Sequence, residues 1–339
     1  MKKVLSVLLF FSIAIAACSC GNSGADETQD TTINESVVTT TTKETTKQTT
    51  KETTKETTQE TTVETTTIDY NEILANMSLE NFPRVDGSTA TIPLFLGYIQ
   101  AITGCSEQEA EALAAFTTTD PSYYALRDGN TDLLLVYAPS QSTDAELDVW
   151  NTMNVQEIGL DALVFIVNED NPVDSLTSEQ IRDIYSGKIT NWKEVGGEDL
   201  PIMAFQRPEK SGSQTLMLEL MMKDTPMVTP TTEVVSETMA DLIDDVSAFD
   251  NSANALGYSV YYYAKNMYTQ PGLKFIAVDG VLPSNESIND QSYGYTHPFY
   301  GIIPKEPTPE AEAFLAYILS EDGQKILEAC GYVPIMKFS

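Results

Sequence analysis

Two polar loops contain the residue types from which an anion site is built. Residues 85–90 read VDGSTA and lie between a short apolar run and a helical pattern. Residues 205–215 read FQRPEKSGSQT and again separate an apolar run from a helical one. In each loop, hydroxyl groups and free backbone N–H groups would meet at a helix N-terminus, which attracts anions. In the second loop, Arg207 adds a guanidinium that can bind an oxyanion through two parallel hydrogen bonds.

Either loop alone is also typical of an ordinary capped helix. Arg207 stands six residues before Ser213 in the same loop, which favours a binding role there. The pair of loops is more informative than either one, so we predict a site for a small anion. Its candidate residues are Ser88, Thr89, Arg207, Ser211, Gly212 and Ser213.

Catalytic and metal sites have few candidate residues in this chain. His297 is the single histidine, and the sequence has no nucleophile-elbow motif. Cys105 and Cys330 are the only cysteines beyond the first twenty residues, too few for a zinc set even with the histidine. They form either one disulfide or two separate buried thiols. We expect no enzymatic activity, no metal and no cofactor.

The charge of the chain excludes one class of partner. Its 50 acidic and 19 basic residues give a formal net charge of −31. Nucleic-acid binding needs a basic surface, so we expect no nucleic-acid partner. A buried anion site remains compatible with this charge because it depends on local donors.

Apolar runs and helical spacings alternate beyond about residue 80, which favours an α/β architecture. The continuous run ALVFIV predicts a sheet that is covered on both faces. A helix is expected over residues 239–249, and a single helix over 310–329 with Gly331 as its stop. We predict strands at residues 132–137, 162–167, 202–205, 257–262 and 274–278.

The N-terminus reads as a secretion signal. Two lysines precede an apolar run over residues 4–17, which is too short to span a bilayer comfortably. The tetrapeptide IAAC that ends at Cys18 resembles the bacterial lipobox. This resemblance implies removal of residues 1–17 and a diacylglycerol on Cys18, with Cys20 a poorer match to the pattern. We expect a protein anchored to the outer face of the cytoplasmic membrane without spanning it.

Residues 18–68 follow the anchor and are dominated by threonine, with Lys-Glu-Thr-Thr units at residues 51–58. Apolar residues are almost absent, so burial cannot offset the entropy of ordering this stretch. The threonine content also opposes a helix. We predict a disordered tether that holds the folded part clear of the membrane.

From about residue 80 to residue 336 the chain resembles the phosphate-binding proteins of bacterial ABC transporters. These are two-lobed proteins of the periplasmic-binding-protein superfamily (class II), with a ligand cleft between the lobes. The resemblance is carried by DGSTA at 86–90, by the stretch from GLDALVFIVN to KEVGG at 159–197, by RPEKSGSQT at 207–215 and by GYSVYYY at 257–263.

The resemblance also implies which residues hold the ligand. The family uses a Ser-Thr loop, a hydroxyl ahead of the next helix and an Arg-x-x-x-Ser-Gly-Thr loop. The matching residues are Ser88, Thr89, Arg207, Ser211, Gly212 and Ser213, with Thr119 as the middle hydroxyl.

One position departs from the family pattern. Relatives that select phosphate place a carboxylate after the second strand, where it accepts the ligand's proton. Our alignment puts Tyr137 at that position, and a phenol is mainly a donor near neutral pH. Glu209 is the alternative acceptor. Sulfate, molybdate or an organic acid therefore remain alternatives to phosphate, and a surface sensor or adhesion module that lost transport is the alternative from another class.

The implied mechanism is binding without chemistry, by closure of two lobes around the anion. We expect lobe 1 to comprise residues 69–164 plus 297–339, and lobe 2 residues 165–296. A monomer would then deliver its ligand to an ABC permease and ATPase complex.

Overall fold

The structure is a computed structural model that describes residues 69–208, 211–230, 235–247 and 253–336. The predicted signal peptide, the lipidation candidate Cys18, the predicted tether and Glu209 lie outside the described residues. Within the described ranges, no helix has both the length and the apolar character needed to cross a bilayer.

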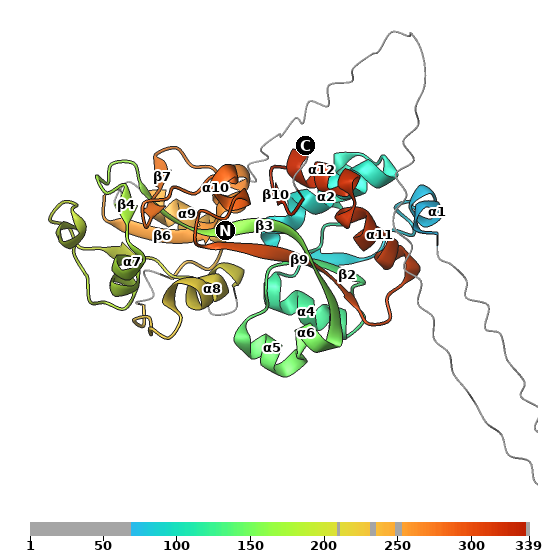
Figure 1. Cartoon of the computed structure of the whole chain (residues 1–339), viewed down its shortest axis with the longest axis horizontal. Coiled ribbons are helices and arrows are strands. Elements are labelled where there is room, and N and C mark those ends of the chain that lie inside the picture. The colour runs from blue at the N-terminus through green and yellow to red at the C-terminus, as the bar shows by residue number, and fades with distance from the viewer. Residues whose placement is uncertain (1–68, 209–210, 231–234, 248–252, 337–339) are drawn as a thin grey trace, which may run out of the picture. The chain divides into compact units, whose positions relative to one another are not determined.

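Strands and helices alternate along the described chain, which confirms the predicted α/β class (Figure 1). The strands are β1 (Val85–Gly87), β2 (Leu133–Val136), β3 (Met153–Asn168), β4 (Ser175–Leu176), β5 (Met203–Ala204), β6 (Ala255–Val260), β7 (Leu273–Phe275), β8 (Ala277–Val278), β9 (Thr296–Pro304) and β10 (Val333–Pro334). The α-helices are α1 (Tyr70–Ala75), α2 (Ile92–Thr103), α3 (Glu107–Glu111), α4 (Thr119–Arg127), α5 (Gln141–Leu147), α6 (Val149–Thr152), α7 (Ser178–Tyr185), α8 (Gly212–Leu216), α9 (Met239–Ser247), α10 (Asn285–Asn289), α11 (Pro309–Leu319) and α12 (Glu321–Ala329). Shorter 3₁₀ and π segments are η1 (Thr89–Thr91), η2 (Trp192–Val195), η3 (Met217–Met222) and η6 (Tyr263–Met267).

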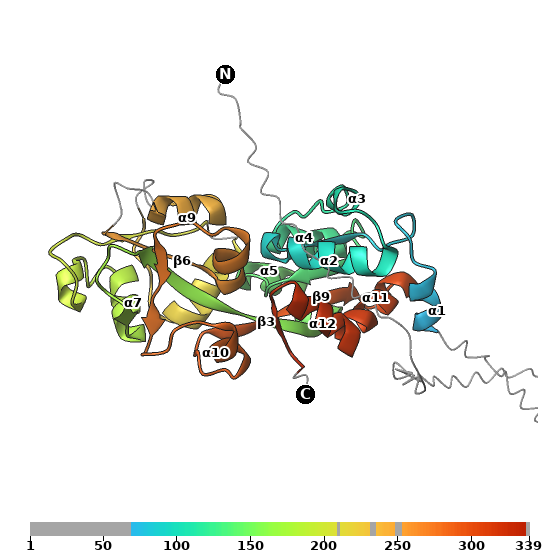
Figure 2. The same cartoon turned by 90° about the horizontal axis from the view of Figure 1, so that it is seen from above.

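The long strand β3 organises the main sheet. From Met153 to Ala162 it pairs with β9, and from Leu163 to Asn168 it pairs with β6 and then β7. The sheet runs in the order β1-β2-β9-β3-β6-β5, with β7 and β10 also bonded to β3. Helices α2, α4, α11 and α12 gather around the β1-β2-β9 part, and α7, α9 and α10 around the β6-β7 part (Figures 1 and 2).

Residues 162–167 of β3 are apolar and buried, with at most 2% of any residue exposed. A strand with both faces buried needs apolar side chains in both directions, which explains the unbroken run ALVFIV. The prediction of a sheet covered on both faces is therefore confirmed.

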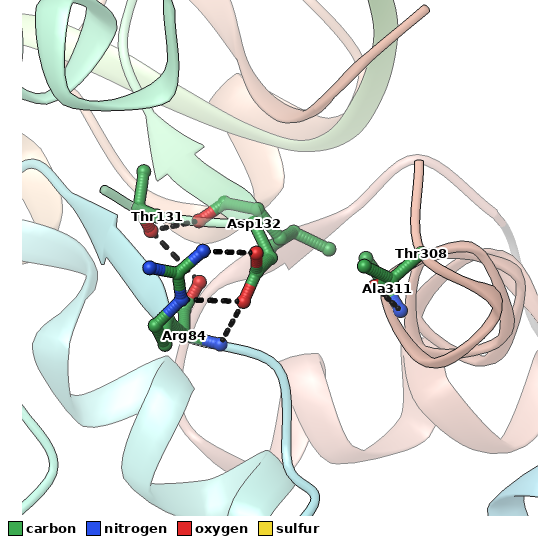
Figure 3. A network of polar contacts seen from close by, with 6 residues as sticks. Arg84, Thr131, Asp132, Thr308 and Ala311 are labelled. Carbon is green, nitrogen blue, oxygen red and sulfur yellow. Dashed lines mark hydrogen bonds and ion pairs between the residues drawn. The ribbon is translucent and has the colours of Figure 1, made fainter. Parts of the chain in front are cut away.

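An ion pair fastens the starts of β1 and β2, whose far ends lead into the candidate site (Figure 3). Arg84 donates from Nε and Nη2 to the two carboxylate oxygens of Asp132, at 2.9 and 2.6 Å. Its backbone N–H donates to the same carboxylate, and the Thr131 hydroxyl donates to its carbonyl. These bonds help to fix the parallel register in which Val85 faces Leu133.

Two predicted elements end earlier than the sequence pattern indicates. The helix expected over 310–329 is two helices, because Ser320 has an extended backbone and its hydroxyl caps α12 through the N–H of Gly323. The strand expected over 257–262 ends at Val260, and the chain continues there as a helix. At residues 260–262 apolar residues run through the boundary, so periodicity alone does not mark it. The break at Ser320 falls in the polar run Ser-Glu-Asp-Gly, which is typical of a helix N-cap.

The two cysteines of the folded part are separate thiols in this structure. Burial raises the pKa of Cys330 to about 11, which keeps it protonated at neutral pH. Its Sγ packs against α2, where a Cβ on Gly97 would lie 2.4 Å from it. Cys330 is thus a packing residue between α12 and α2.

We expect Gly87→Ala to destabilise the protein by about 3 kcal/mol or to prevent folding. A Cβ at this position would lie 1.8 Å from the Leu135 carbonyl oxygen, a backbone atom that cannot move aside. Gly129→Ala is the control, because its φ is also positive but no atom lies within 4 Å of the added Cβ. Its cost should stay near 1 kcal/mol. Urea unfolding measures both, and equal costs would contradict the clash.

Candidate functional site

A cavity of about 250 Å³ lies where the loops after β1, β2 and β5 meet the N-termini of α4 and α8. Glu209 lies outside the described residues, and the other eight ligand-binding residues predicted from sequence all line this cavity. They are Ser88, Thr89, Thr119, Tyr137, Arg207, Ser211, Gly212 and Ser213. Segments separated by more than a hundred residues in the sequence are therefore brought to one place.

Hydroxyl groups from the first loop and from α4 meet at one side of the cavity. Ser88 Oγ and Thr119 Oγ1 lie 2.8 Å apart, within hydrogen-bond distance. The buried carboxylate of Asp86 holds the two segments together, because it accepts bonds from the backbone N–H of Gly87 and from the backbone and hydroxyl of Thr117. The pairing places both hydroxyls at the cavity wall.

The start of α4 has a strained backbone and lies close to α8. Thr118, which also lines the cavity, has a φ of 90°, an unfavourable value for a β-branched residue. A Cβ added to Gly212 would lie 2.8 Å from Thr119 Oγ1. Glycine at 212 thus permits the close approach of the two helix N-termini, whose free N–H groups favour an anion.

Arg207 brings a buried cation to the cavity. It is 9% exposed, and its Nη2 donates to the backbone carbonyl of Glu237 at 3.1 Å. Among the described residues, its Nε and Nη1 atoms have no hydrogen-bond partner, nor has the nearby hydroxyl of Ser213. Burial lowers the pKa of Arg207, yet a guanidinium stays charged in proteins. Buried donors without partners are costly, so this group is suited to an anion.

The backbone of Arg207 is fixed by two buried polar side chains. Its N–H donates to the Tyr258 hydroxyl and to Gln214 Oε1, at 3.0 and 3.2 Å. The Tyr258 hydroxyl in turn donates to the same Gln214 oxygen. Burial raises the pKa of Tyr258 well above 10, so the phenol remains a donor. The guanidinium therefore projects from a rigid base.

Tyr137 lines the cavity with its ring, while its hydroxyl is bonded elsewhere. The hydroxyl donates to Asp161 Oδ2 at 2.6 Å, and the residue is 2% exposed. Burial, and then the Asp161 carboxylate, hold the pKa of this phenol well above 10. Its backbone N–H donates to Ser88 Oγ at 3.1 Å. In this structure Tyr137 shapes the wall and orients Ser88, while its hydroxyl is bonded to the buried Asp161 carboxylate.

Glu237 is a cavity-lining carboxylate residue that the sequence pattern missed. It precedes Thr238 and Asp241, whose side chains each accept the other's backbone N–H at the start of α9. That reciprocal cap is visible in the sequence and predicts a helix start. A bridge between Gln206 and Val235 brings the segment beside Arg207, and only the folded chain shows this.

Two buried ionisable residues, paired across β3 and β9, lie behind Tyr137. Burial raises the pKa of Asp161 to about 6, against the lowering effect of the hydrogen bonds it accepts. Burial lowers the pKa of His297 to about 4, so this imidazole is neutral near pH 7. The His297 ring lies 5.4 Å from the ring of Tyr137 and does not line the cavity.

The groups that line the cavity are suited to binding an oxyanion. Hydroxyls, helix N-termini and one guanidinium converge on the cavity, all of them donors to an oxyanion. The single histidine, the usual partner of a nucleophilic serine, does not line it. In the described part of the chain, no group of three or more His, Cys, Asp or Glu residues is placed to hold a metal.

The fold and this cavity are typical of an α/β class of binding protein, and comparison with known proteins agrees. Residues 39–322 match the model of the PBP superfamily domain, so the chain belongs to that family. Among curated relatives, it is 26% identical over 259 residues to the phosphate-binding protein PstS of Bacillus subtilis, covering 74% of this chain and 80% of that protein. It is 24% identical over 272 residues to PstS of Staphylococcus aureus, covering 76% and 80% of the two chains.

Solved structures give the same result. A phosphate ABC transporter substrate-binding protein from Clostridium perfringens, solved with bound phosphate, matches with a TM-score of 0.61 at 25% identity, over 76% of this chain and all of that one. An ABC-type phosphate transport receptor from Vibrio cholerae matches with a TM-score of 0.57 at 24% identity, over 74% and 98% of the two chains. The latter likeness shows the fold.

Replacing His297 by Gln should reduce the loss of stability between pH 6.5 and pH 4. In this window His297 binds a proton in the unfolded chain but stays neutral in the folded chain, because burial lowers its pKa to about 4. The parent protein should therefore lose up to about 3 kcal/mol as the pH falls through the window. The raised pKa of Asp161 acts in the opposite sense, and it is present in both proteins. Urea unfolding at pH 7 and pH 4.5 measures the difference, and identical losses would contradict a neutral buried imidazole.

Proposed function

We propose that this protein is the extracytoplasmic receptor of an ABC importer and binds inorganic phosphate in the cavity described above. The observation that carries the proposal is the buried guanidinium of Arg207, which has two nitrogen donors without partners among the described residues. The Ser213 hydroxyl, which also has no partner in the described part of the chain, and the Ser88–Thr119 pair add donors at the same cavity. A tetrahedral oxyanion would complement these groups.

The cavity residues divide between the two proposed lobes. Ser88 and Thr119 belong to lobe 1, residues 69–164 plus 297–339. Arg207 and Ser213 belong to lobe 2, residues 165–296. An anion bound by both groups would favour the closed arrangement, because closure follows from better binding to one state than to the other. The β3 and β9 strands would be the crossings between the lobes.

The proposal places the protein on the outer face of the membrane. Cys18 would carry the lipid, and residues 18–68 would link it to the folded part. A bound anion would pass to a permease and its ATPase, with the receptor acting as a monomer. Mass spectrometry of the mature N-terminus tests the lipid, and co-purification from membranes tests the permease partner.

Arg207→Ala should weaken phosphate binding at least 100-fold, equivalent to about 2.7 kcal/mol. The parent should bind phosphate with micromolar or tighter affinity once unfolding and refolding have removed carried-over ligand. Arg127→Ala is the matched control, since Arg127 is an exposed arginine at the far end of α4 that pairs with Asp128. Calorimetric titration with phosphate, sulfate and molybdate measures each protein.

Unchanged affinity in Arg207→Ala would refute the proposed site. Binding of sulfate or molybdate in preference to phosphate would keep the site and change the ligand. No binding of any of the three anions would refute the transport receptor and favour a sensor or adhesion role for the same fold.

Glu237→Gln should lower the preference for phosphate over sulfate by about tenfold or more. Monohydrogen phosphate has a proton that a carboxylate can accept, whereas sulfate has none and is repelled by the charge. Tyr137 is less suited to this role, because a phenol is mainly a donor near neutral pH and its hydroxyl is bonded to Asp161. Glu179→Gln, at an exposed position in the first turn of α7, removes the same charge as a control. Loss of the preference in Glu209→Gln instead would assign the acceptor to the loop predicted from sequence.

A further inference from the structure

Asp161 lies where β3 changes its pairing partner from β9 to β6. It is the next-to-last β3 residue to pair with β9, opposite His297, and Leu163 two residues later pairs with β6. Its carboxylate is buried and accepts bonds on both oxygens. Oδ2 takes the hydroxyl of Tyr137 at 2.6 Å, and Oδ1 takes the backbone N–H groups of Ala162 and Tyr262 at 2.7 and 3.1 Å. One side chain thus joins the loop after β2 to the segment after β6.

The contacts of Asp161 continue on both sides to the first anion-binding loop. On one side, the Tyr137 backbone N–H donates to Ser88 Oγ at 3.1 Å. On the other, the Tyr262 ring stacks on Tyr332 with centroids 3.5 Å apart, and the Tyr332 hydroxyl donates to the Ala90 carbonyl at 2.7 Å. Residues 88 and 90 are therefore held from two directions, through a closed set of contacts that meets at Asp161.

We propose that Asp161 is a positioning residue of the anion site, holding Tyr137 and Tyr262 so that the loop at residues 88–90 is fixed for binding. This inference rests on the proposed function, and Asp161 itself does not touch the ligand. A carboxylate is required because its two oxygens accept three donors at once, which a single amide oxygen cannot do without losing a bond. The ionisable side chains that face it are Tyr137, Tyr262 and His297.

The cost of burying this carboxylate supports the assignment. A buried charge without a cation beside it is expensive, and the structure offsets it with three hydrogen bonds rather than with a salt bridge among the described residues. Packing alone would be served better by an apolar side chain in an otherwise apolar part of β3. An apolar residue at this position would leave the three donors, which are the Tyr137 hydroxyl and the N–H groups of Ala162 and Tyr262, without an acceptor.

The test is a double-mutant cycle on phosphate affinity, made with the purified mature protein. Asp161→Asn should weaken binding about tenfold or more, and Tyr137→Phe, which keeps the ring, should weaken it about threefold or more. The double variant should bind within about twofold of Asp161→Asn, because the hydroxyl has lost its acceptor already. Asp132→Asn is the control: it removes a carboxylate at the opposite end of β2 (Figure 3) and should leave affinity unchanged.

Parent affinity in Tyr137→Phe, or fully additive losses in the double variant, would overturn the proposal. If Asp161→Asn does not fold, the affinity of Tyr137→Phe alone tests the proposal, and parent affinity in that variant overturns it. A parent protein that binds phosphate while the cycle is additive would refute the positioning role and leave the proposed function intact.

A second readout needs no ligand. In ¹⁵N NMR spectra of the ligand-free protein, Tyr137→Phe should shift the backbone amide signals of Ser88 and Tyr262, and Asp132→Asn should not. If the parent binds no anion, the proposed function fails, and these spectra still show whether the contact between Tyr137 and Asp161 holds Ser88 and Tyr262 in place. Unshifted amide signals at both positions would overturn it.

Discussion

The pairing of β3 with two sets of partners is the constraint on which the rest of the structure depends. One strand of sixteen residues bonds to β9 and β10 along its first part and to β6 and β7 along its second. Every backbone group in a buried strand needs a partner, so the strand fixes both parts of the sheet at once. The cavity residues sit on loops at the ends of other strands in this sheet. Their positions are therefore set by hydrogen bonds made far from them.

The cavity itself depends on donors that the fold leaves without partners. Arg207 is held by its backbone through Gln214 and Tyr258, and its guanidinium is buried with only one bond made among the described residues. Buried donors without partners destabilise the protein when the site is empty. They bind an anion more strongly than exposed donors would, because electrostatic interactions are stronger where water is largely excluded. The acidic charge of the chain as a whole does not oppose this, because local donors dominate at short range.

Much of the site could be predicted from the sequence because its motifs are local. The loop with Ser88 and Thr89 before a helix, and Arg207 followed by Ser-Gly-Ser, each indicate an anion site from fewer than ten consecutive residues. The cap at Ser320 was missed although the polar run Glu-Asp-Gly follows it, because the helical spacing of the apolar residues before and after that run continues across it. Tyr137 lines the cavity, but the direction of its hydroxyl depends on Asp161, 24 residues further along the chain. Glu237 was missed because no motif marks it. The bridge between Gln206 and Val235 brings its segment beside Arg207.

The sequence by itself determined the α/β class, the buried strand at residues 162–167 and the two polar loops that line the cavity. These features follow from local periodicity and from residue chemistry over short spans, which do not depend on contacts with distant residues. Only the tertiary structure decided which hydroxyls meet, which way Tyr137 points and where Asp161 and Glu237 lie. Those features arise from contacts between residues far apart in the sequence, and the pairing of β3 with β9 and β6 creates them.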